Sequence, residues 1–182
     1  EANYDPKIGK VYFGEGKSLN QEGEFSDRVL AVRKLFDQAQ IQYHIEEDMI
    51  YSIWYKFMSN MGENLTCALL GVPYIAFHRS EHANLIRNRA MEEVVAVAKA
   101  KGIGLSEKDI ELQNRFIEKL PAANIPSTLQ DLEAGKKTEI EMFAGRMMEF
   151  GKEYGIATPY CELFYHAIRV LEEKNEGLFL VE

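Results

Sequence analysis

The sequence predicts a mainly α-helical protein in which a short β-α-β piece precedes a helical domain. Apolar residues recur every three or four positions through most of the chain beyond Asp48, as they do along amphipathic helices. Glycine and proline divide this region into segments, for example at Gly71-Val-Pro73 and Pro159. The 182 residues are 46% hydrophobic and 27% charged, which is typical of a globular protein with a real core.

The first fifty residues alternate between two apolar runs and one amphipathic segment. Residues 10–16 and 41–50 have the composition of strands, and residues 27–39 have a helical period. Ser26 or Asp27 can accept a hydrogen bond at the start of that helix. We therefore expect a β-α-β unit here.

The remaining chain, residues 49–182, is expected to form one helical domain, with the boundary after residue 48. The expected helices cover residues 49–70, 80–101, 106–119, 127–135, 138–154 and 159–175.

Charge, apolar run lengths and cysteine positions exclude several classes of protein. The net charge of −8, with no stripe of basic residues, argues against a nucleic-acid partner. No apolar run reaches the length of a membrane span, and no signal-peptide core begins the chain. Cys67 and Cys161 have neither disulfide nor metal-ligand spacing, so we expect a cytoplasmic protein.

The stretch WYKFMSNMGENL places three polar residues at four-residue intervals within an otherwise apolar helix. With Lys56 at zero on a helical wheel, Asn60 falls at about 40° and Asn64 at about 80°. The apolar arc covers about 60° to about 200°, so the polar stripe borders this arc and partly overlaps it. Because the stripe lies at the border of the apolar arc, we expect it to face either a cleft or a neighbouring element. The alternative is a boundary lysine with two asparagines that bond nearby backbone.

The stretch HRSEH matches the H-x-x-E-H pattern of inverted zinc proteases. A zinc hydrolase would use His78 and His82 as ligands and Glu81 as general base, which requires both histidines on one helix. Ser80 is a plausible N-cap, and a cap there would place His78 outside the helix. We therefore expect a polar loop before a helix, and no metal site.

Two polar residues near the end of the chain have local explanations. Ser127 followed by Gln130 resembles a capping box, so Ser127 alone predicts an N-cap. Glu139 shares a wheel face with Phe143 and Phe150, which predicts a carboxylate among apolar residues at a helix start. The helix dipole alone accounts for an acidic first turn, and a ligand or cation partner is the alternative.

Taken together, these stretches resemble a known family. The order W-x-K-x3-N-x3-N, then S-x-L-Q-D, T-E-I-E and G-x-x-x-P is similar to the C-terminal half of ketopantoate reductase (2-dehydropantoate 2-reductase). The resemblance covers roughly residues 9–175 and is most specific from Pro126 to Pro159. It implies a helical domain similar to that of 6-phosphogluconate dehydrogenase. Residues 1–48 would be the last β-α-β piece of a Rossmann-type, NADPH-binding domain.

The resemblance also implies a function. The family reduces a 2-keto acid, ketopantoate, with NADPH in pantothenate biosynthesis, so a small-molecule keto acid is the implied substrate. The family's opening G-x-G-x-x-G fingerprint does not occur in this sequence, which begins at Glu1 without methionine. We therefore expect a piece of a longer enzyme that is inactive alone and that dimerises, if at all, through its helical domain. A non-catalytic helical dimerisation or binding module is the alternative.

Site residues are carried over from the family position by position. Lys56 matches the catalytic lysine, and Asn60 and Asn64 match substrate-binding asparagines. Lysine suits a proton donor to a developing alkoxide because burial can lower its pKa toward neutrality. Asparagines provide neutral donors to a hydroxyl or carboxylate.

The remaining matches lie in the second half of the chain. Ser127 matches a substrate-binding serine, where a helix N-terminus would help to bind a carboxylate. Asn124 matches a further asparagine near the site, and Glu139 matches a cofactor-contacting glutamate. A further substrate-contacting asparagine of the family aligns near Tyr74, which puts the identity of the substrate in doubt.

Overall fold

The computed structural model describes residues 9–17 and 23–180, and the chain divides into two compact units. The first unit ends at Trp54 and the second begins at Tyr55. Each unit is described by itself.

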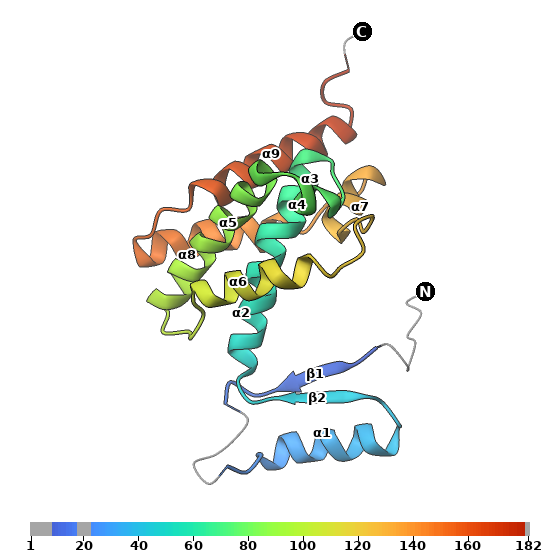
Figure 1. Cartoon of the computed structure of the whole chain (residues 1–182), viewed down its shortest axis with the longest axis vertical. Helices are drawn as coiled ribbons and strands as arrows, with labels where there is room; N and C mark the ends of the chain where they lie inside the picture. Colours follow the sequence, from blue (N-terminus) through green and yellow to red (C-terminus); the bar gives the residue numbers. More distant parts are fainter. Residues whose placement is uncertain (1–8, 18–22, 181–182) are drawn as a thin grey trace. The chain divides into compact units, whose positions relative to one another are not determined.

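Within the described residues, the first unit contains a parallel pair of short strands, the helix that connects them and the start of the next helix (Figure 1). Strand β1 (Val11–Gly14) pairs with β2 (Tyr43–Glu46), and helix α1 (Asp27–Gln38) connects them. Parallel strands require a crossover connection, which α1 provides. The Phe36 ring of α1 packs edge-on against Phe13 of β1, with 5.3 Å between ring centroids.

Side-chain hydrogen bonds mark the start of α1 and the start of the helix that follows β2. The Ser26 hydroxyl accepts a hydrogen bond from the Val29 amide, which confirms one of the two predicted caps of α1. The second strand is shorter than the expected residues 41–50, because the Asp48 carboxylate accepts from the Tyr51 amide at 2.9 Å and starts a helix.

The second unit is helical throughout, which confirms the mainly α fold class. Helix α2 (Met49–Ser59) crosses from the first unit into the second. Its other elements are η1 (Asn60–Asn64), α3 (Leu65–Leu70), α4 (Ile75–Arg79), α5 (Glu81–Ala100), α6 (Glu107–Ile117), α7 (Ser127–Glu133), η2 (Glu141–Gly145), α8 (Arg146–Tyr154) and α9 (Pro159–Asn175).

Most of the helix predictions agree with these bounds, and α4 was missed. A helix of five residues is too short to show a helical period, and its His78-Arg79 end was expected to be a loop. Cys67 and Cys161 are buried free thiols. Among residues 9–17 and 23–180, no helix has both the length and the apolarity needed to cross a membrane.

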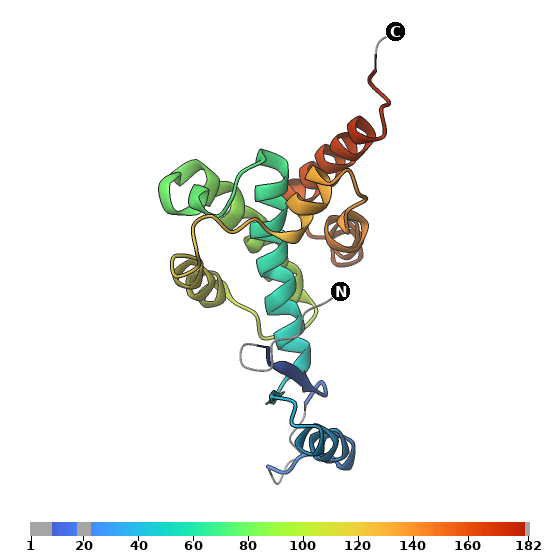
Figure 2. The ribbon, with the colours of Figure 1, turned by 90° about the vertical axis from the view of Figure 1, so that its right-hand side faces the viewer.

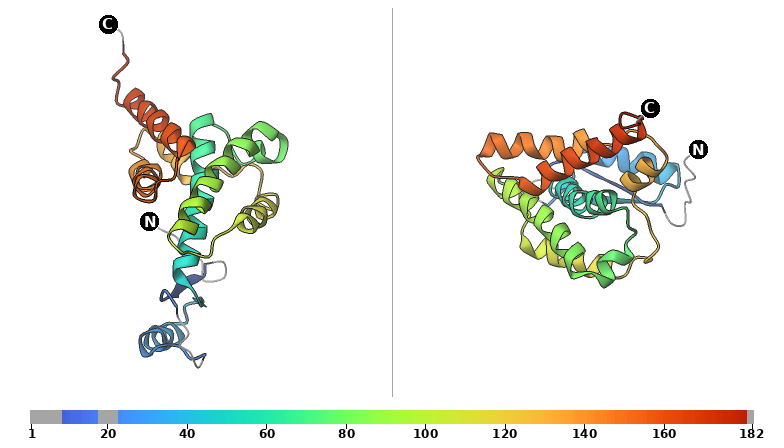
Figure 3. Two further views of the ribbon diagram at one scale, coloured as in Figure 1. Left: turned by 90° about the vertical axis from the view of Figure 1, so that its left-hand side faces the viewer. Right: turned by 90° about the horizontal axis from the view of Figure 1, so that it is seen from above.

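From Tyr55 to Leu70 the chain forms one continuous rod through the helical unit (Figures 2 and 3). Helix α5 packs against the η1 part of this rod, and α9 packs against its α3 part. Within η1 the Leu65 amide donates to the Asn60 carbonyl, a π-helical bond that spans five residues instead of four. The rod therefore contains one widened turn where its polar stripe lies.

Two buried carboxylates join α9 to the rest of the unit. Glu93 of α5 accepts hydrogen bonds from the Tyr160 and Cys161 amides at 2.7 and 3.0 Å, and so satisfies the open amides at the start of α9. Glu172 of α9 accepts from both the amide and the hydroxyl of Thr138. The two hydrogen bonds between Thr138 and Glu172 fix the backbone just before η2.

Gly62 allows the widened turn to lie directly against α5. A Cβ atom at this position would be 2.6 Å from the Met91 Cγ and 3.1 Å from the Arg87 carbonyl oxygen. Met91 is fully buried, so its side chain has no free space to move into. Any other residue at position 62 would push α5 away from the turn.

We predict that Gly62→Ala destabilises the helical unit by about 1–3 kcal/mol, the usual range for overpacking. Gly104→Ala is the matched control, because nothing lies within 4 Å of a Cβ there. Denaturant unfolding of both variants measures the difference. Equal midpoints for the two variants would show that the contact between η1 and α5 is not tight.

Candidate functional site

The polar stripe passes from the surface of the helical unit into its core. Lys56 is exposed, Asn60 is half-buried, and Asn64 retains 8% of its accessible surface. The wheel of 100° per residue, used to place these side chains, is wrong across residues 60–64. Each residue of a π turn advances by less than that, so Asn64 lies closer in angle to Asn60 than predicted.

The side-chain amides of Asn60 and Asn64 are available to a ligand. Neither amide makes a hydrogen bond within the part of the chain that the structure describes. The alternative in which both asparagines bond nearby backbone is therefore not supported. Although most of the Asn64 residue is buried, its amide is not fully enclosed, so the amide can be reached from solvent.

Ser127 is the first residue of α7, and α7 packs against both η1 and α3. The prediction that Ser127 is the N-cap is wrong: Pro126 takes that position, and no side chain caps the helix. Gln130 instead donates to the Ile125 carbonyl at 2.6 Å. The exposed Ser127 hydroxyl is thus not used as a cap.

Asn124 lies beside the position where the family's further asparagine would align. The Tyr74 amide donates to the Asn124 carbonyl at 3.0 Å, so the connection before α4 meets the loop before α7. Burial, with smaller effects of Glu63 and Cys67, raises the pKa of Tyr74 to about 12. The Tyr74 phenol is therefore neutral at ordinary pH, and its ring lies beside that of Phe77, with 6.0 Å between centroids.

Glu139 lies at the bend just before η2, and η2 packs against η1. The rings of Phe57 and Phe143 also bring these two segments together, with centroids 6.3 Å apart. Glu139 itself is exposed, so the wheel was wrong to enclose its carboxylate among apolar residues. Thr138, held by Glu172, fixes the backbone at this bend.

A buried polar cluster beneath the stripe was missed by the sequence analysis. Glu63, within η1, accepts a hydrogen bond from Gln113 of α6 at 2.8 Å and lies 4.0 Å from a guanidinium nitrogen of Arg87. Arg87 also donates to Asn114 and lies over the Phe77 ring. One feature of the sequence could have revealed this cluster: the residues four before, three after and four after Arg87, which share its helix face, are all apolar.

Desolvation dominates the electrostatics of this cluster. Burial raises the pKa of Glu63, while Gln113, Arg87 and Lys56 each oppose that rise. Burial also lowers the pKa of Arg87, against the attraction of Glu63. The charge on Lys56 thus acts on a carboxyl group buried one residue before Asn64.

The H-x-x-E-H stretch does not form a metal centre in this structure. Ser80 caps α5 by accepting from the Ala83 amide at 3.2 Å, as predicted, and His78 lies in the separate helix α4. The His78 ring instead contacts the Ile117 carbonyl. Within residues 9–17 and 23–180, no three His, Cys, Asp or Glu side chains are grouped closely enough to hold a metal ion.

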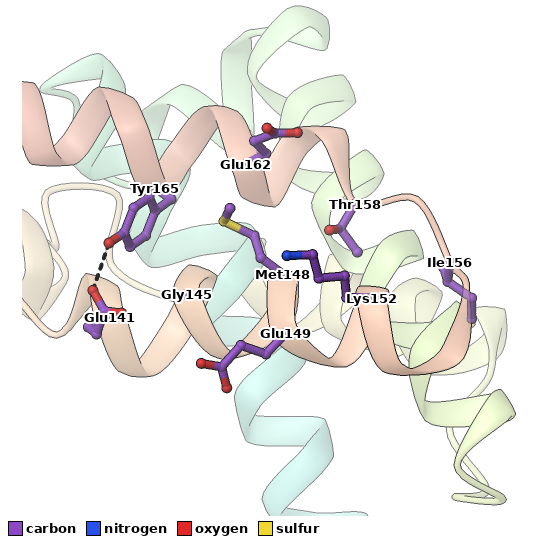
Figure 4. Close-up of a pocket in the computed structure, with 10 residues that line it drawn as sticks. Glu141, Gly145, Met148, Glu149, Lys152, Ile156, Thr158, Glu162 and Tyr165 are labelled. Carbon is purple, nitrogen blue, oxygen red and sulfur yellow. Dashed lines mark hydrogen bonds between the residues drawn. The ribbon is translucent and has the colours of Figure 1, made fainter.

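A groove of about 490 Å³ lies between the η2–α8 segment and α9 (Figure 4). Three carboxylates line it, from Glu141, Glu149 and Glu162, with the ammonium of Lys152, and the Tyr165 hydroxyl donates to Glu141 at 2.8 Å. None of the six predicted site residues lines this groove. Its negative charge disfavours a carboxylate ligand, so the stripe and the groove are separate features.

Comparison with known families identifies the chain. Residues 48–172 match the family described as ketopantoate reductase PanE/ApbA C terminal. The chain belongs to this family, which confirms the resemblance seen in the sequence. A 2-dehydropantoate 2-reductase from Aquifex aeolicus is 32% identical over 146 residues, which cover 78% of this chain and 47% of that protein.

Solved structures share the fold. The 2-dehydropantoate 2-reductase from Methylococcus capsulatus matches 92% of this chain and 56% of its own, with a TM-score of 0.75 and 27% identity. A D-mandelate dehydrogenase solved with NADH and anilino(oxo)acetate matches 85% of this chain and 52% of its own, with a TM-score of 0.75. Its identity of 24% shows the fold alone. The chain spans about half the length of the curated relatives it matches.

The raised pKa of Glu63 predicts a pH dependence of stability. The folded state holds this proton more tightly than the unfolded chain, so the contribution of Glu63 is fully present below pH 4.5. It is lost as the pH rises through the raised pKa of the folded state. Glu63→Gln cannot titrate, so the parent should lose stability relative to this variant as the pH increases from 4.5.

Chemical unfolding of both proteins at a series of pH values measures this difference. A stability difference that stays constant, or that grows in favour of the parent as the pH rises, would show that Arg87 and Gln113 lower the pKa of Glu63 by at least as much as burial raises it.

Proposed function

We propose that the helical unit is the substrate-binding and proton-donating half of an NADPH-dependent reductase of a 2-keto acid, either ketopantoate or a related compound. In this proposal, residues 1–48 are the end of a Rossmann-type nucleotide-binding domain and residues 49–182 form the catalytic domain. The parallel β1–α1–β2 unit supports the first part, because doubly wound nucleotide-binding domains are built from such units.

One observation carries the proposal: the widened turn after Lys56 holds two asparagine amides that have no partner among the described residues. A 2-keto acid presents a ketone oxygen, a carboxylate and neighbouring polar groups within a few ångströms. An ammonium and two neutral amides along one helix face can bind these groups without placing a second charge beside the lysine.

Lys56 is the group that acts on the reacting oxygen. Hydride addition to the ketone carbon moves negative charge onto the oxygen, and a positioned ammonium both attracts that charge and supplies a proton. Ser127 and Asn124 add a hydroxyl and an amide, because α7 packs beside η1 and the Asn124 loop meets Tyr74. Both can donate hydrogen bonds to the substrate carboxylate.

NADPH, when bound, supplies the hydride. The exposed carboxylate of Glu139 suits this cofactor, because it can accept hydrogen bonds from ribose hydroxyls. The fixed bend at Thr138 holds that carboxylate at the start of η2. A homodimer through the helical domain, a cytoplasmic location and the absence of membrane and nucleic-acid partners all stay predictions.

Lys56→Ala should reduce turnover by about 100- to 10,000-fold in the protein that joins this chain to its nucleotide-binding half. The charge on Lys56 matters most once the ketone oxygen becomes an alkoxide, so kcat should fall more than KM rises. Steady-state kinetics with ketopantoate and NADPH measures both. Lys174→Ala, a change of an exposed lysine near the end of α9, is the control.

Thermal melts of the Lys56→Ala protein should match those of the parent, since an exposed lysine contributes little packing beyond its stem. Asn60→Ala and Asn64→Ala should instead raise KM, with smaller changes in kcat. A Lys56→Ala protein with parental turnover would contradict the reductase site and favour a non-catalytic helical module.

The chain by itself should bind NADPH no more tightly than about 1 mM, or roughly 4 kcal/mol. Its sequence has no glycine-rich turn to hold the pyrophosphate. Isothermal titration of the 182-residue chain tests this. Micromolar affinity would show that a second nucleotide site exists within the chain.

A further inference from the structure

We propose that Gln113 is a positioning residue that holds both ends of the polar stripe, through Tyr55 and Glu63. This inference rests on the proposed function of the stripe and goes beyond it, because it assigns Gln113 a role through Tyr55 and Glu63 instead of through the substrate or cofactor. Tyr55 immediately precedes Lys56 in the chain, and Glu63 immediately precedes Asn64.

The geometry of the bridge is direct. The Tyr55 hydroxyl donates to the Gln113 side-chain oxygen at 2.9 Å, and the Gln113 side-chain nitrogen donates to the Glu63 carboxylate at 2.8 Å. One amide on α6 therefore connects two residues of the rod that are eight positions apart. The α and π turns between these two residues contain Lys56 and Asn60.

The chemistry of the three groups determines the orientation of the amide. The amide nitrogen faces Glu63 and donates to its carboxyl group, while the amide oxygen faces Tyr55 and accepts from its hydroxyl. Gln113 keeps only 4% of its accessible surface, and water therefore has little access to its bond with Glu63, while its bond with Tyr55 is part-buried. A buried bridge with both of its bonds made restricts the side chains on either end.

Arg87 holds the Glu63 end of the bridge from the other side. Its guanidinium is fixed by the Asn114 oxygen at 2.5 Å and by the Phe77 ring, with 4.6 Å to the ring centroid. Its Nε and Nη1 groups are buried and have no hydrogen-bond partner among the described residues. Nη1 lies 4.0 Å from the Glu63 carboxylate, so the positive charge attracts the carboxylate toward α5.

The alternative role for this cluster is structural only. Buried polar networks often stabilise a core without any effect on a ligand. The two roles differ in what a mild substitution changes. Loss of positioning changes the affinity of the site for substrate, whereas loss of stability alone reduces the amount of folded enzyme and leaves KM unchanged.

Two variants test the bridge at different strengths. Tyr55→Phe removes only the hydroxyl bond and keeps the ring, and Gln113→Met removes both bonds while it keeps the side-chain length. Tyr43→Phe is the matched control, because its hydroxyl donates to Asp37 within the first unit. Each is made in the enzyme that carries its nucleotide-binding half.

Two quantities are measured for each variant. Hydrogen exchange at the Leu65 amide, which donates to the Asn60 carbonyl, reports how firmly the widened turn is held. Steady-state kinetics with ketopantoate gives KM and kcat. We expect faster exchange and a KM raised about threefold by Tyr55→Phe and about tenfold by Gln113→Met, as the loss of one or two hydrogen bonds would give, with kcat changed by less than about threefold. Tyr43→Phe should match the parent in both measurements.

The outcomes separate the two proposals. Parental KM in both bridge variants, whether kcat falls or not, would overturn the positioning role and leave the reductase function intact. If Gln113→Met fails to fold, Tyr55→Phe alone decides by the same criterion. A parent enzyme that reduces no 2-keto acid would overturn the proposed function and, with it, this inference.

Discussion

The close packing of the Asn60–Asn64 turn against α5 is the constraint on which the proposed site depends. Gly62 lets the two backbones approach, and the extra residue in the π turn shifts every later side chain of the rod relative to Lys56. If this turn were a regular α-helical turn, Asn64 would lie about 80° from Lys56 on the helical wheel, within the apolar arc. π turns within α-helices frequently occur at functional sites, and their local strain is offset by the surrounding structure.

Buried charges of opposite sign lie beneath this turn. Glu63 and Arg87 lie in the core close to an exposed lysine, so their state of ionisation affects the field at Lys56. Burying such a pair is seldom favourable for stability alone. Its presence directly under the polar stripe is more easily explained by control of geometry and charge than by packing.

Much of the fold could be predicted from the sequence, because long amphipathic helices carry a clear period and clear ends. The α5 helix, with Ser80 at its cap, was predicted to within one residue at each end. The short helix α4 could not be found, since five residues show no period. The π turn was missed for a different reason: it is determined by the contact of Gly62 with α5, which no local pattern in the rod encodes.

The candidate site was predicted only in part. Lys56 and the two asparagines were visible as a stripe, and the helical wheel singled out Glu139 as a carboxylate that could have a ligand or cation partner. The site roles of Ser127 and Asn124 came from family resemblance alone. Gln113 and Glu63 were not identified, because their role depends on contacts fifty residues apart in sequence. Arg87 could have been noticed from its apolar helical neighbours, although its partners could not have been named.

The central claim is that the widened turn binds the keto acid through Asn60 and Asn64. Side-chain amide NMR resonances test it most directly, in the enzyme that carries its nucleotide-binding half, with NADP⁺ bound and ketopantoate added. Asn175, whose amide donates to the Leu132 carbonyl at 2.8 Å, is the internal reference. We predict that the Asn60 and Asn64 amide resonances shift with saturation while that of Asn175 stays in place. Unchanged Asn60 and Asn64 resonances in an enzyme that is saturated with substrate would contradict the claim.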